Sequence, residues 1–225
     1  MKGDSVIIEA HHKAAASAII PVILPLVEQS DQRFTISVAG QSGSGKTEIA
    51  TAIALALESH GINSVILHQD DYFVHPPRTN DATRRAGIDW VGTGEVHLDL
   101  MDEHLAAFIN GAKLIEKPLV DYENDTILNE KLQTEGARVA LADGTYTTLL
   151  QNVNCRVFID RDYLDTRAHR EKRNRDKSEL DPFIDRVLEI EHRIISAHKV
   201  QADIIVNRDY SITVINQPQQ LQVFS

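Results

Sequence analysis

The sequence predicts an α/β fold in which a mostly parallel central sheet lies between two layers of helices. Short apolar runs, typical of strands buried inside parallel sheets, alternate along the chain with longer segments of helical periodicity. A glycine-rich turn follows the first apolar run directly and leads into a helical segment. Strands that alternate with helices in this way favour a doubly wound, three-layer sandwich.

Apolar patterns and turn residues place the individual elements. The expected strands are 34–39, 64–68, 113–121, 138–142, 156–160 and 202–206, with a less regular β-rich segment from 211 onward. The expected helices are 9–29, 47–60, 95–110, 163–177 and 182–200. Gly61 and Gly111 end two of the helices, and Asp181 followed by Pro182 is a typical helix start. We therefore expect an N-terminal helical segment over 1–30 and a main domain over 31–225.

Composition excludes several classes of protein. The 225 residues are 42% hydrophobic and 25% charged, which is typical of a globular chain with a sizeable core. With 33 acidic and 23 basic residues the net charge is -10, which argues against nucleic acid as a partner. The longest apolar stretch, 14–27, contains two prolines and is shorter than the roughly 20 residues that span a bilayer. We expect a cytoplasmic protein with no membrane partner, and a buried strand position for the single cysteine, Cys155.

The turn after the first strand carries the most specific motif. Residues 40–47, GQSGSGKT, match the template G-x-x-x-x-G-K-[ST] at every position. Glycines let the chain wrap a phosphate group with its own N–H groups, and the following helix directs its positive end at the anion. In such a P-loop Lys46 reaches the β- and γ-phosphates, and the Thr47 hydroxyl reaches Mg²⁺. The motif predicts that ATP and Mg²⁺ bind at Gly40, Ser42, Gly43, Ser44, Gly45, Lys46, Thr47 and Glu48.

A P-loop alone leaves a kinase, a motor ATPase and a GTPase open. The Asn-Lys-x-Asp string by which a GTPase normally recognises guanine is absent. Asp70 and Asp71 follow the strand 64–68, at the edge where open α/β sheets bind ligands. One of these carboxylates could accept the proton of a hydroxyl group during phosphoryl transfer. The alternative is a pair of turn-forming aspartates without a catalytic role.

With these motifs in place, residues 34–207 resemble the uridine kinase and phosphoribulokinase family of P-loop kinases. The resemblance rests on the P-loop and on the segments 69–73 (QDDYF), 141–144 (LADG) and 158–176, with 202–206 as a weaker match. It implies an enzyme that transfers the γ-phosphoryl group of ATP to a hydroxyl group of a small molecule. It also implies a P-loop NTPase-type sandwich with a helical lid. By this resemblance, Asp70 matches the catalytic base of the family, Tyr72 matches a residue of the acceptor site, and Asp143 matches a residue that holds Mg²⁺ together with Thr47.

The helical lid is expected over about 163–180, which is the only dense basic segment of the sequence. Arg167, Arg170 and Arg173 are three residues apart and share one broad helical face, which could close over the phosphates. The alternative is a solvated helix that pairs its charges with neighbouring acidic residues. We expect Arg167, Arg170 and Arg175 to contribute to catalysis.

The acceptor is the open question, because the chain departs from the uridine kinase pattern. Val120 stands where those kinases have a base-contacting tyrosine, and Asp125 occupies the histidine position that follows. No Arg-Gly-Arg string follows Arg175 and Asp176. The nearest acceptor-contacting candidates are Tyr122 and Asp89. The alternatives are a nucleoside, a sugar, glycerate or a pantothenate-like alcohol as acceptor, or an ATPase switch without any acceptor; a homo-oligomer stays open.

Overall fold

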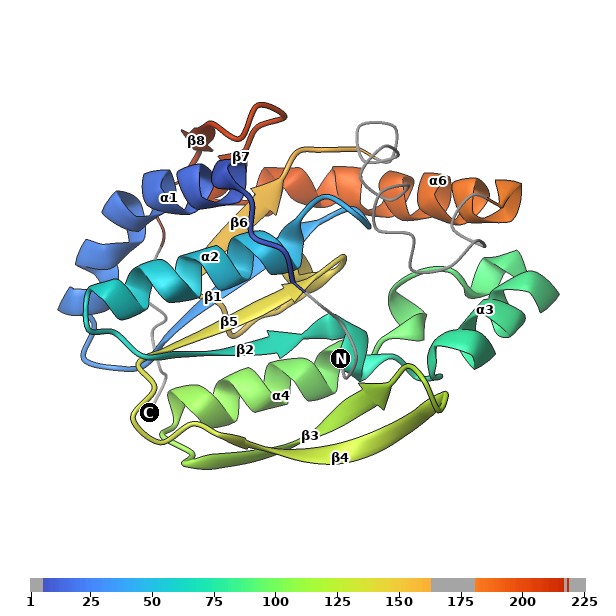
Figure 1. The fold of residues 1–225 in the computed structure, drawn as a ribbon, viewed down its shortest axis with the longest axis horizontal. Coiled ribbons are helices and arrows are strands. Elements are labelled where there is room, and N and C mark those ends of the chain that lie inside the picture. Colours follow the sequence, from blue (N-terminus) through green and yellow to red (C-terminus); the bar gives the residue numbers. More distant parts are fainter. Residues whose placement is uncertain (1–5, 163–180, 217, 219–225) are drawn as a thin grey trace.

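The computed structural model describes residues 6–162, 181–216 and 218 of the chain (Figure 1). A six-stranded sheet forms the centre, and its strand order is β2-β5-β1-β6-β7-β8. The first five strands run parallel to one another, and β8 runs antiparallel to β7. The strands in spatial order are β2 (Ser64–His68), β5 (Val139–Gly144), β1 (Phe34–Gly40), β6 (Cys155–Ile159), β7 (Ile204–Val206) and β8 (Ile212–Val214).

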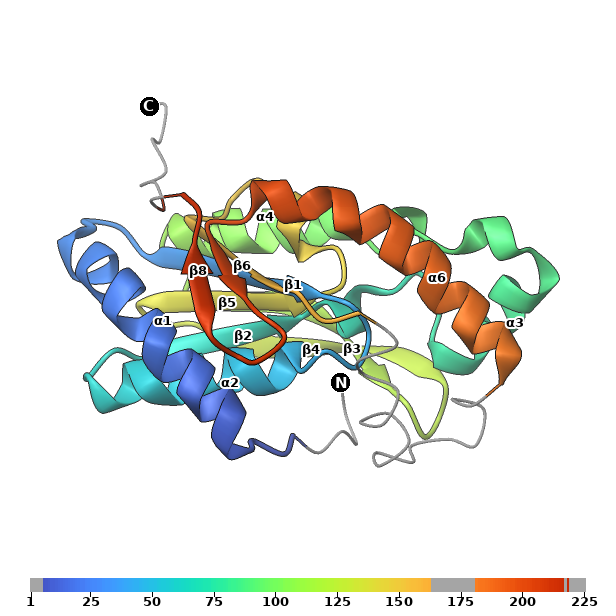
Figure 2. The same cartoon turned by 90° about the horizontal axis from the view of Figure 1, so that it is seen from above.

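Helices cover both faces of this sheet, as the two perpendicular views show (Figures 1 and 2). They are α1 (Ala10–Gln29), α2 (Lys46–Ser59), α4 (Leu98–Ile109) and α6 (Pro182–Ser196). A further helix, α3 (Pro77–Ala86), lies beyond the ends of the strands, at the right of Figure 1. Residues of α1 and α2 pack together on one face, and residues of α4 and α6 belong to a second hydrophobic cluster on the other. The three-layer α/β fold with a mostly parallel sheet is therefore confirmed.

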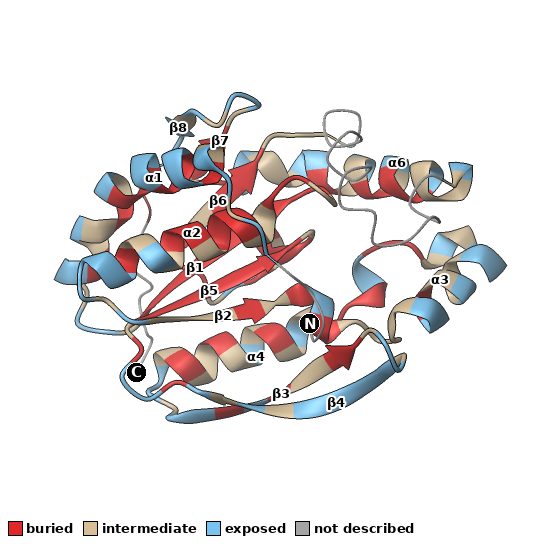
Figure 3. Ribbon diagram, viewed as in Figure 1, coloured by how far each residue is buried: buried red, intermediate tan, exposed pale blue. Residues whose placement is uncertain are grey.

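The central position of β1 is reflected in its burial. All seven of its residues are buried, and all six of β5 are as well, so the middle of the sheet is the most enclosed part of the molecule (Figure 3). Alternate residues serve opposite clusters: Ile36 and Val38 face the α1–α2 side, whereas Ala39 belongs to the α4–α6 side. Cys155 lies fully buried on β6, as its apolar neighbours predict.

Two elements were not expected from the sequence. α3 buries only Asn80, so it has no apolar stripe that would reveal it as a helix. β4 (Thr126–Gln133) pairs antiparallel with β3 (Leu114–Asp121) in a separate hairpin. Six of the eight β4 residues are exposed, including Ile127 and Leu128, so the alternation that marks a half-buried strand is missing.

Two predicted helices are shorter than expected. α4 begins at Leu98 and not at Glu95, because Glu95 lies in a 3₁₀ turn where its carboxylate accepts the N–H of Gly92. α6 ends at Ser196 and continues as a 3₁₀ helix over Ala197–Gln201. Its expected start is confirmed, because the Asp181 side chain accepts the N–H of Phe183 at 2.9 Å.

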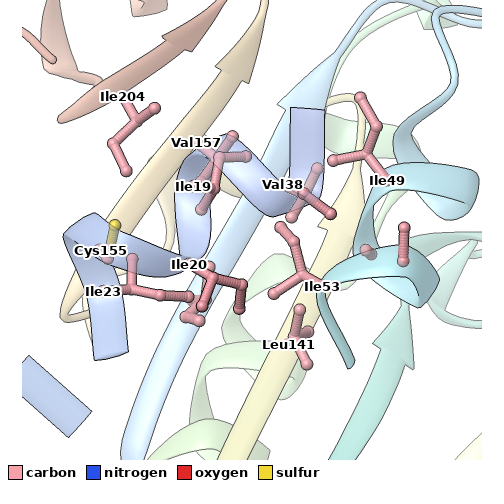
Figure 4. Close-up of a cluster of buried hydrophobic side chains, with 14 of the residues drawn as sticks. Ile19, Ile20, Ile23, Val38, Ile49, Ile53, Leu141, Cys155, Val157 and Ile204 are labelled. Atoms are coloured by element: carbon pink, nitrogen blue, oxygen red, sulfur yellow. The ribbon is translucent and has the colours of Figure 1, made fainter. Parts of the chain in front are cut away.

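The N-terminal helix α1 shares the hydrophobic core of the sheet. Ile19 and Ile23 have no exposed surface and meet residues of α2, β1 and β6 (Figure 4). Among the described helices, α1 alone is long and apolar enough to pass as a membrane span by length and composition. In this structure its apolar face is occupied by the packing against α2 and the sheet.

Removal of a buried side chain of α1 should therefore destabilise the whole domain. We expect Ile19→Ala to lower the free energy of unfolding by about 2–5 kcal/mol, the usual range for a buried large-to-small change. Leu55→Ala on α2 is the matched control, since Leu55 is 51% exposed and its loss should cost little. Urea denaturation measures both, and equal small losses for the two variants would contradict the packing of α1 into the core.

Candidate active site

The P-loop connects the buried strand β1 to the first turn of α2. Gly43 and Gly45 have φ values of 77° and 93°, a left-handed conformation that favours glycine. A Cβ atom on Gly40 would lie 2.8 Å from the Ser44 hydroxyl oxygen and 3.1 Å from Ile159, so a side chain there would clash. The three motif glycines are thus needed by the backbone geometry, which turns the loop around the N-terminus of α2.

Eight of the predicted site residues line one pocket at this loop. The pocket is lined by Ser42, Gly43, Gly45, Lys46, Thr47 and Glu48 from the loop and α2, by His68, Gln69 and Asp70 after β2, by Asp143, Gly144 and Thr145 after β5, and by Val6. Gly40 and Ser44 lie beside it, and the Ser44 N–H closes the loop onto the Gln41 carbonyl at 3.0 Å. The carboxyl ends of β2 and β5 meet the P-loop because these strands run parallel to β1 on the same side.

Lys46 is the central cation of the pocket. Its ammonium group donates to the Gln41 carbonyl at 3.0 Å. Burial lowers the pKa of Lys46, against the opposing influence of Asp70, Asp143 and Glu191. An ammonium group in the pocket formed by the glycine-rich loop is suited to bind phosphate oxygens.

The two adjacent aspartates after β2 have different roles. Asp71 is 1% exposed; it accepts the Lys117 ammonium at 2.8 Å and the Val120 N–H at 3.0 Å, so it fastens β3 to the main sheet. Asp70 faces the pocket, and its surface is open there. Loss of solvent on its protein-facing sides raises the pKa of Asp70, which Lys46 opposes and Asp143 reinforces. A carboxylate with a raised pKa beside the phosphate loop is suited to accept a proton.

Asp143 joins the P-loop helix to the end of β5. One of its oxygens accepts the Thr47 hydroxyl at 2.5 Å, and the other lies 2.6 Å from His68 Nδ1. Burial alone would raise the pKa of Asp143, but His68, Thr47 and Lys46 together hold it below its usual value. For His68, burial acts to lower the pKa, but the Asp143 carboxylate opposes it through its charge and its hydrogen bond, and the pKa is raised overall. Sequence reasoning missed His68, because a histidine before the Gln-Asp pair carries no pattern of its own.

Thr47 and Asp143 fit the binding of Mg²⁺. Their oxygen atoms are hard ligands that lie together at the phosphate pocket. Among the residues described here, no three His, Cys, Asp or Glu side chains form a metal-holding group. This agrees with the coordination habit of Mg²⁺, which takes one or two protein ligands and completes its shell with water and phosphate oxygens.

The structure places the other predicted residues away from the pocket. Tyr72 is fully buried in the second hydrophobic cluster, with its hydroxyl 2.8 Å from His104 Nδ1, so its ring belongs to the packing between β2 and α4. Asp89 is exposed in a 3₁₀ turn after α3, and Tyr122 lies in the β3–β4 turn; neither lines the pocket. The lid arginines Arg167, Arg170, Arg173 and Arg175 lie outside the described residues.

Helix α6 is attached directly to the P-loop, which the sequence did not reveal. The Gln41 side chain donates to the Leu188 carbonyl at 2.6 Å, and its oxygen lies 3.2 Å from His192 Nδ1. Glu191 lies in the same turn of α6 and is buried. Arg84 of α3 reaches Glu191 at 3.4 Å and the buried Glu95 at 2.5 Å. Only the tertiary structure brings these charged residues together behind the pocket.

Comparison with known proteins agrees with this architecture. Residues 35–213 match the model of the Phosphoribulokinase / Uridine kinase family. The chain belongs to this family of P-loop kinases. The family match begins after α1, so the N-terminal helix lies outside it.

Relatives within the family differ in what they phosphorylate. The chain is 34% identical over 195 residues to the bifunctional alpha-galactosidase/sucrose kinase AgaSK of Mediterraneibacter gnavus; the match covers 81% of this chain but only 21% of that much longer protein. It is 28% identical over 181 residues to the uridine kinase of Staphylococcus haemolyticus, with 76% of this chain and 86% of the relative covered.

Solved structures share the fold at lower identity. A possible uridine kinase from Bacillus stearothermophilus superposes with a TM-score of 0.57 at 17% identity, covering 86% of this chain and 97% of the other. The D-glycerate 3-kinase of Cryptococcus neoformans gives a TM-score of 0.59 at 12% identity, with coverages of 92% and 100%. At these identities the comparison establishes the fold alone.

The buried pair of Asp71 and Lys117 should matter for stability. We expect Lys117→Met to lower the free energy of unfolding by about 3–5 kcal/mol, because it leaves a buried carboxylate without its partner. Lys113→Met is the matched control on the same hairpin, since Lys113 pairs with Glu135 and both side chains are largely exposed. Chemical denaturation measures the difference, and equal stabilities of the two variants would contradict a structural role for Asp71.

Proposed function

We propose that this protein is an ATP-dependent kinase that transfers the γ-phosphoryl group to a hydroxyl group of a small molecule. The observation that carries the proposal is the placement of Lys46 and Asp70 in one pocket, with the Thr47–Asp143 contact beside them. A phosphate-binding cation and a candidate base thus lie together. Membership of the Phosphoribulokinase / Uridine kinase family supports the same reaction class.

The proposed reaction exchanges one phosphorus–oxygen bond for another. The acceptor oxygen attacks the γ-phosphorus, the bond from that phosphorus to the β–γ bridging oxygen breaks, and ADP leaves. Asp70 takes the proton of the attacking hydroxyl group. Lys46 and the loop N–H groups stabilise the negative charge of the phosphates. Thr47 and Asp143 would hold Mg²⁺, which neutralises phosphate charge when bound.

Two positions of the β3–β4 hairpin, Val120 and Asp125, bear on uridine as the acceptor. Val120 is fully buried and its N–H is used by Asp71, so it offers nothing to a pyrimidine edge. Asp125 accepts the N–H of Arg78 and the hydroxyl of Thr79, which fixes the β3–β4 turn to α3. A site without base-edge partners discriminates weakly between nucleosides and other alcohols. We infer that uridine is a poor acceptor or no better than other hydroxyl compounds of similar size.

An acceptor panel with ADP release as readout tests the proposal. The panel contains uridine, cytidine, neutral sugars, glycerate and pantothenate, each added to protein, ATP and Mg²⁺. A kinase releases ADP in proportion to one class of acceptor. Slow ADP release that no acceptor increases would instead favour an ATPase switch.

Substitution of the base should separate chemistry from nucleotide binding. We expect Asp70→Asn to lower kcat by ~10²- to 10⁴-fold, the range for a positioned general base, with nearly unchanged ATP affinity. Lys46→Ala should abolish transfer in a folded protein, because Lys46 acts on the phosphates. Steady-state kinetics and calorimetric ATP titration check both. Loss of kcat in a stably folded Asp71→Asn variant, with Asp70→Asn unaffected, would move the base by one residue.

The pH profile should report the raised pKa of Asp70. Asp70 accepts a proton only as a carboxylate, so activity is present above its pKa and is lost as the pH falls through it. Because burial raises that pKa, the acidic limb of kcat/KM should lie above the ordinary aspartate pKa of 3.8. The residual activity of Asp70→Asn should lack this limb. An identical limb in the variant would assign it to another group.

A further inference from the structure

A buried charged cluster lies behind the phosphate pocket, where α3 and α6 approach each other. Arg84 of α3 bridges two carboxylates: its Nε lies 2.5 Å from Glu95 and a terminal nitrogen lies 3.4 Å from Glu191. The side chains of both glutamates are almost completely enclosed. Trp90 and Asn80 extend this network, since the indole N–H donates to the Asn80 oxygen and the Asn80 amide donates to Glu95.

Two polar atoms at this cluster have no hydrogen-bond partner within the described part of the chain. They are the second carboxylate oxygen of Glu191 and the hydroxyl oxygen of Tyr146. Glu191 is 6% exposed and Tyr146 is 1% exposed. An unsatisfied buried polar group costs stability, so such atoms are rare unless they serve a ligand or water. Burial is the largest influence that raises the pKa of Tyr146, and the negative charge of Glu191 is the second. This electrostatic interaction indicates that the two groups lie near each other.

Both groups are connected to the reacting end of the pocket. The Tyr146 N–H donates to the side-chain oxygen of Gln69 at 2.7 Å, and Gln69 directly precedes Asp70. Glu191 lies in the turn of α6 that Gln41 holds against the P-loop. Its carboxylate interacts electrostatically with Lys46 and with Asp70. These contacts connect the cluster to Gln69, which lines the pocket beside Asp70, and to Gln41 of the P-loop.

The charges of the cluster select among acceptor classes. Arg84 carries one positive charge, and Glu95 and Glu191 together offset or exceed it, so the cluster never presents a net positive charge to a ligand. It would not attract a carboxylate or phosphate group. A neutral hydroxyl group meets both open positions, because it can donate to the Glu191 oxygen and accept from the Tyr146 hydroxyl.

We propose that Glu191 and Tyr146 bind hydroxyl groups of a neutral sugar, which is the acceptor phosphorylated at this site. The proposal rests on the proposed kinase function and names its substrate class. A sugar presents several hydroxyl groups on one ring, so one can reach Asp70 while others reach the cluster. In this proposal the residues that bind the acceptor belong to α6 and to the turn after β5, and not to the β3–β4 hairpin.

The first test compares acceptor classes with the full-length protein. Neutral hexoses, disaccharides and sugar alcohols are assayed against glycerate, pantothenate and uridine, with ADP release as readout. We expect a neutral sugar to give the highest kcat/KM. A higher kcat/KM for any acidic acceptor or for uridine would overturn the proposal and leave the kinase function intact.

The second test removes the two hydrogen-bonding groups separately. We expect Tyr146→Phe and Glu191→Gln each to raise KM for the best sugar by roughly tenfold or more, as the loss of a buried hydrogen bond implies. The dissociation constant of ADP, measured by calorimetry, should stay within about twofold. Glu189→Gln is the matched control, because Glu189 lies on the same helix with an exposed side chain and pairs only with Arg193 there. It should leave KM unchanged.

Thermal stability separates ligand binding from a structural role. Tyr146→Phe removes only the hydroxyl group, which has no partner among the described residues, so the Tm of the ligand-free variant should be unchanged or higher. A lower Tm with an unchanged sugar KM would assign the hydroxyl to structure and overturn the proposal. An unchanged sugar KM in both variants would overturn it as well. By contrast, failure of the kinase function itself would appear as ADP release that no acceptor stimulates in the wild-type protein.

Discussion

The hydrogen bond between Thr47 and Asp143 links the two parts of the site that must work together. Thr47 belongs to the first turn of α2, whereas Asp143 ends β5, between β1 and β2 in the sheet. This contact fixes the phosphate loop relative to the strand ends that carry Asp70 and His68. It depends in turn on the parallel pairing of β5 with both neighbours, which brings all three carboxyl ends to one edge. The chemistry of the pocket therefore follows from the register of three adjacent strands.

Around this edge, neighbouring residues divide between structure and chemistry. Asp71 accepts hydrogen bonds from the Lys117 ammonium and from the Val120 N–H of β3, whereas Asp70 faces the pocket. Gln41 occupies a position that the P-loop motif leaves unspecified. Its side chain holds α6 against the loop by donating a hydrogen bond to the Leu188 carbonyl. Gln41 thus holds α6 against the phosphate loop, whereas Asp71 holds the hairpin against the turn after β2.

The elements around the phosphate loop are those that would meet the acceptor. Relatives of this chain include proteins named sucrose kinase and uridine kinase, so family membership alone does not name the acceptor. In this chain the β3–β4 hairpin uses Val120 and Asp125 for internal contacts, whereas α3 and α6 enclose a polar cluster with open hydrogen-bonding positions. Burial of Arg84 between two glutamates gives that cluster a charge balance unsuited to anions. In the proposed acceptor site, the hydroxyl groups of the acceptor meet residues of α6 and of the turn after β5.

The sequence by itself determined the sheet strands, the phosphate loop and the pair Asp70 and Asp71, because each depends on local signals: apolar runs, glycine spacing and turn chemistry. It did not reveal α3 or β4, whose exposed residues leave no apolar period. Nor could it place Tyr72 in the core, or set Glu191 beside Arg84, which lies 107 residues away along the chain. Those contacts depend on long-range packing, in which the side chains that meet share no local pattern. Tertiary structure alone decided them.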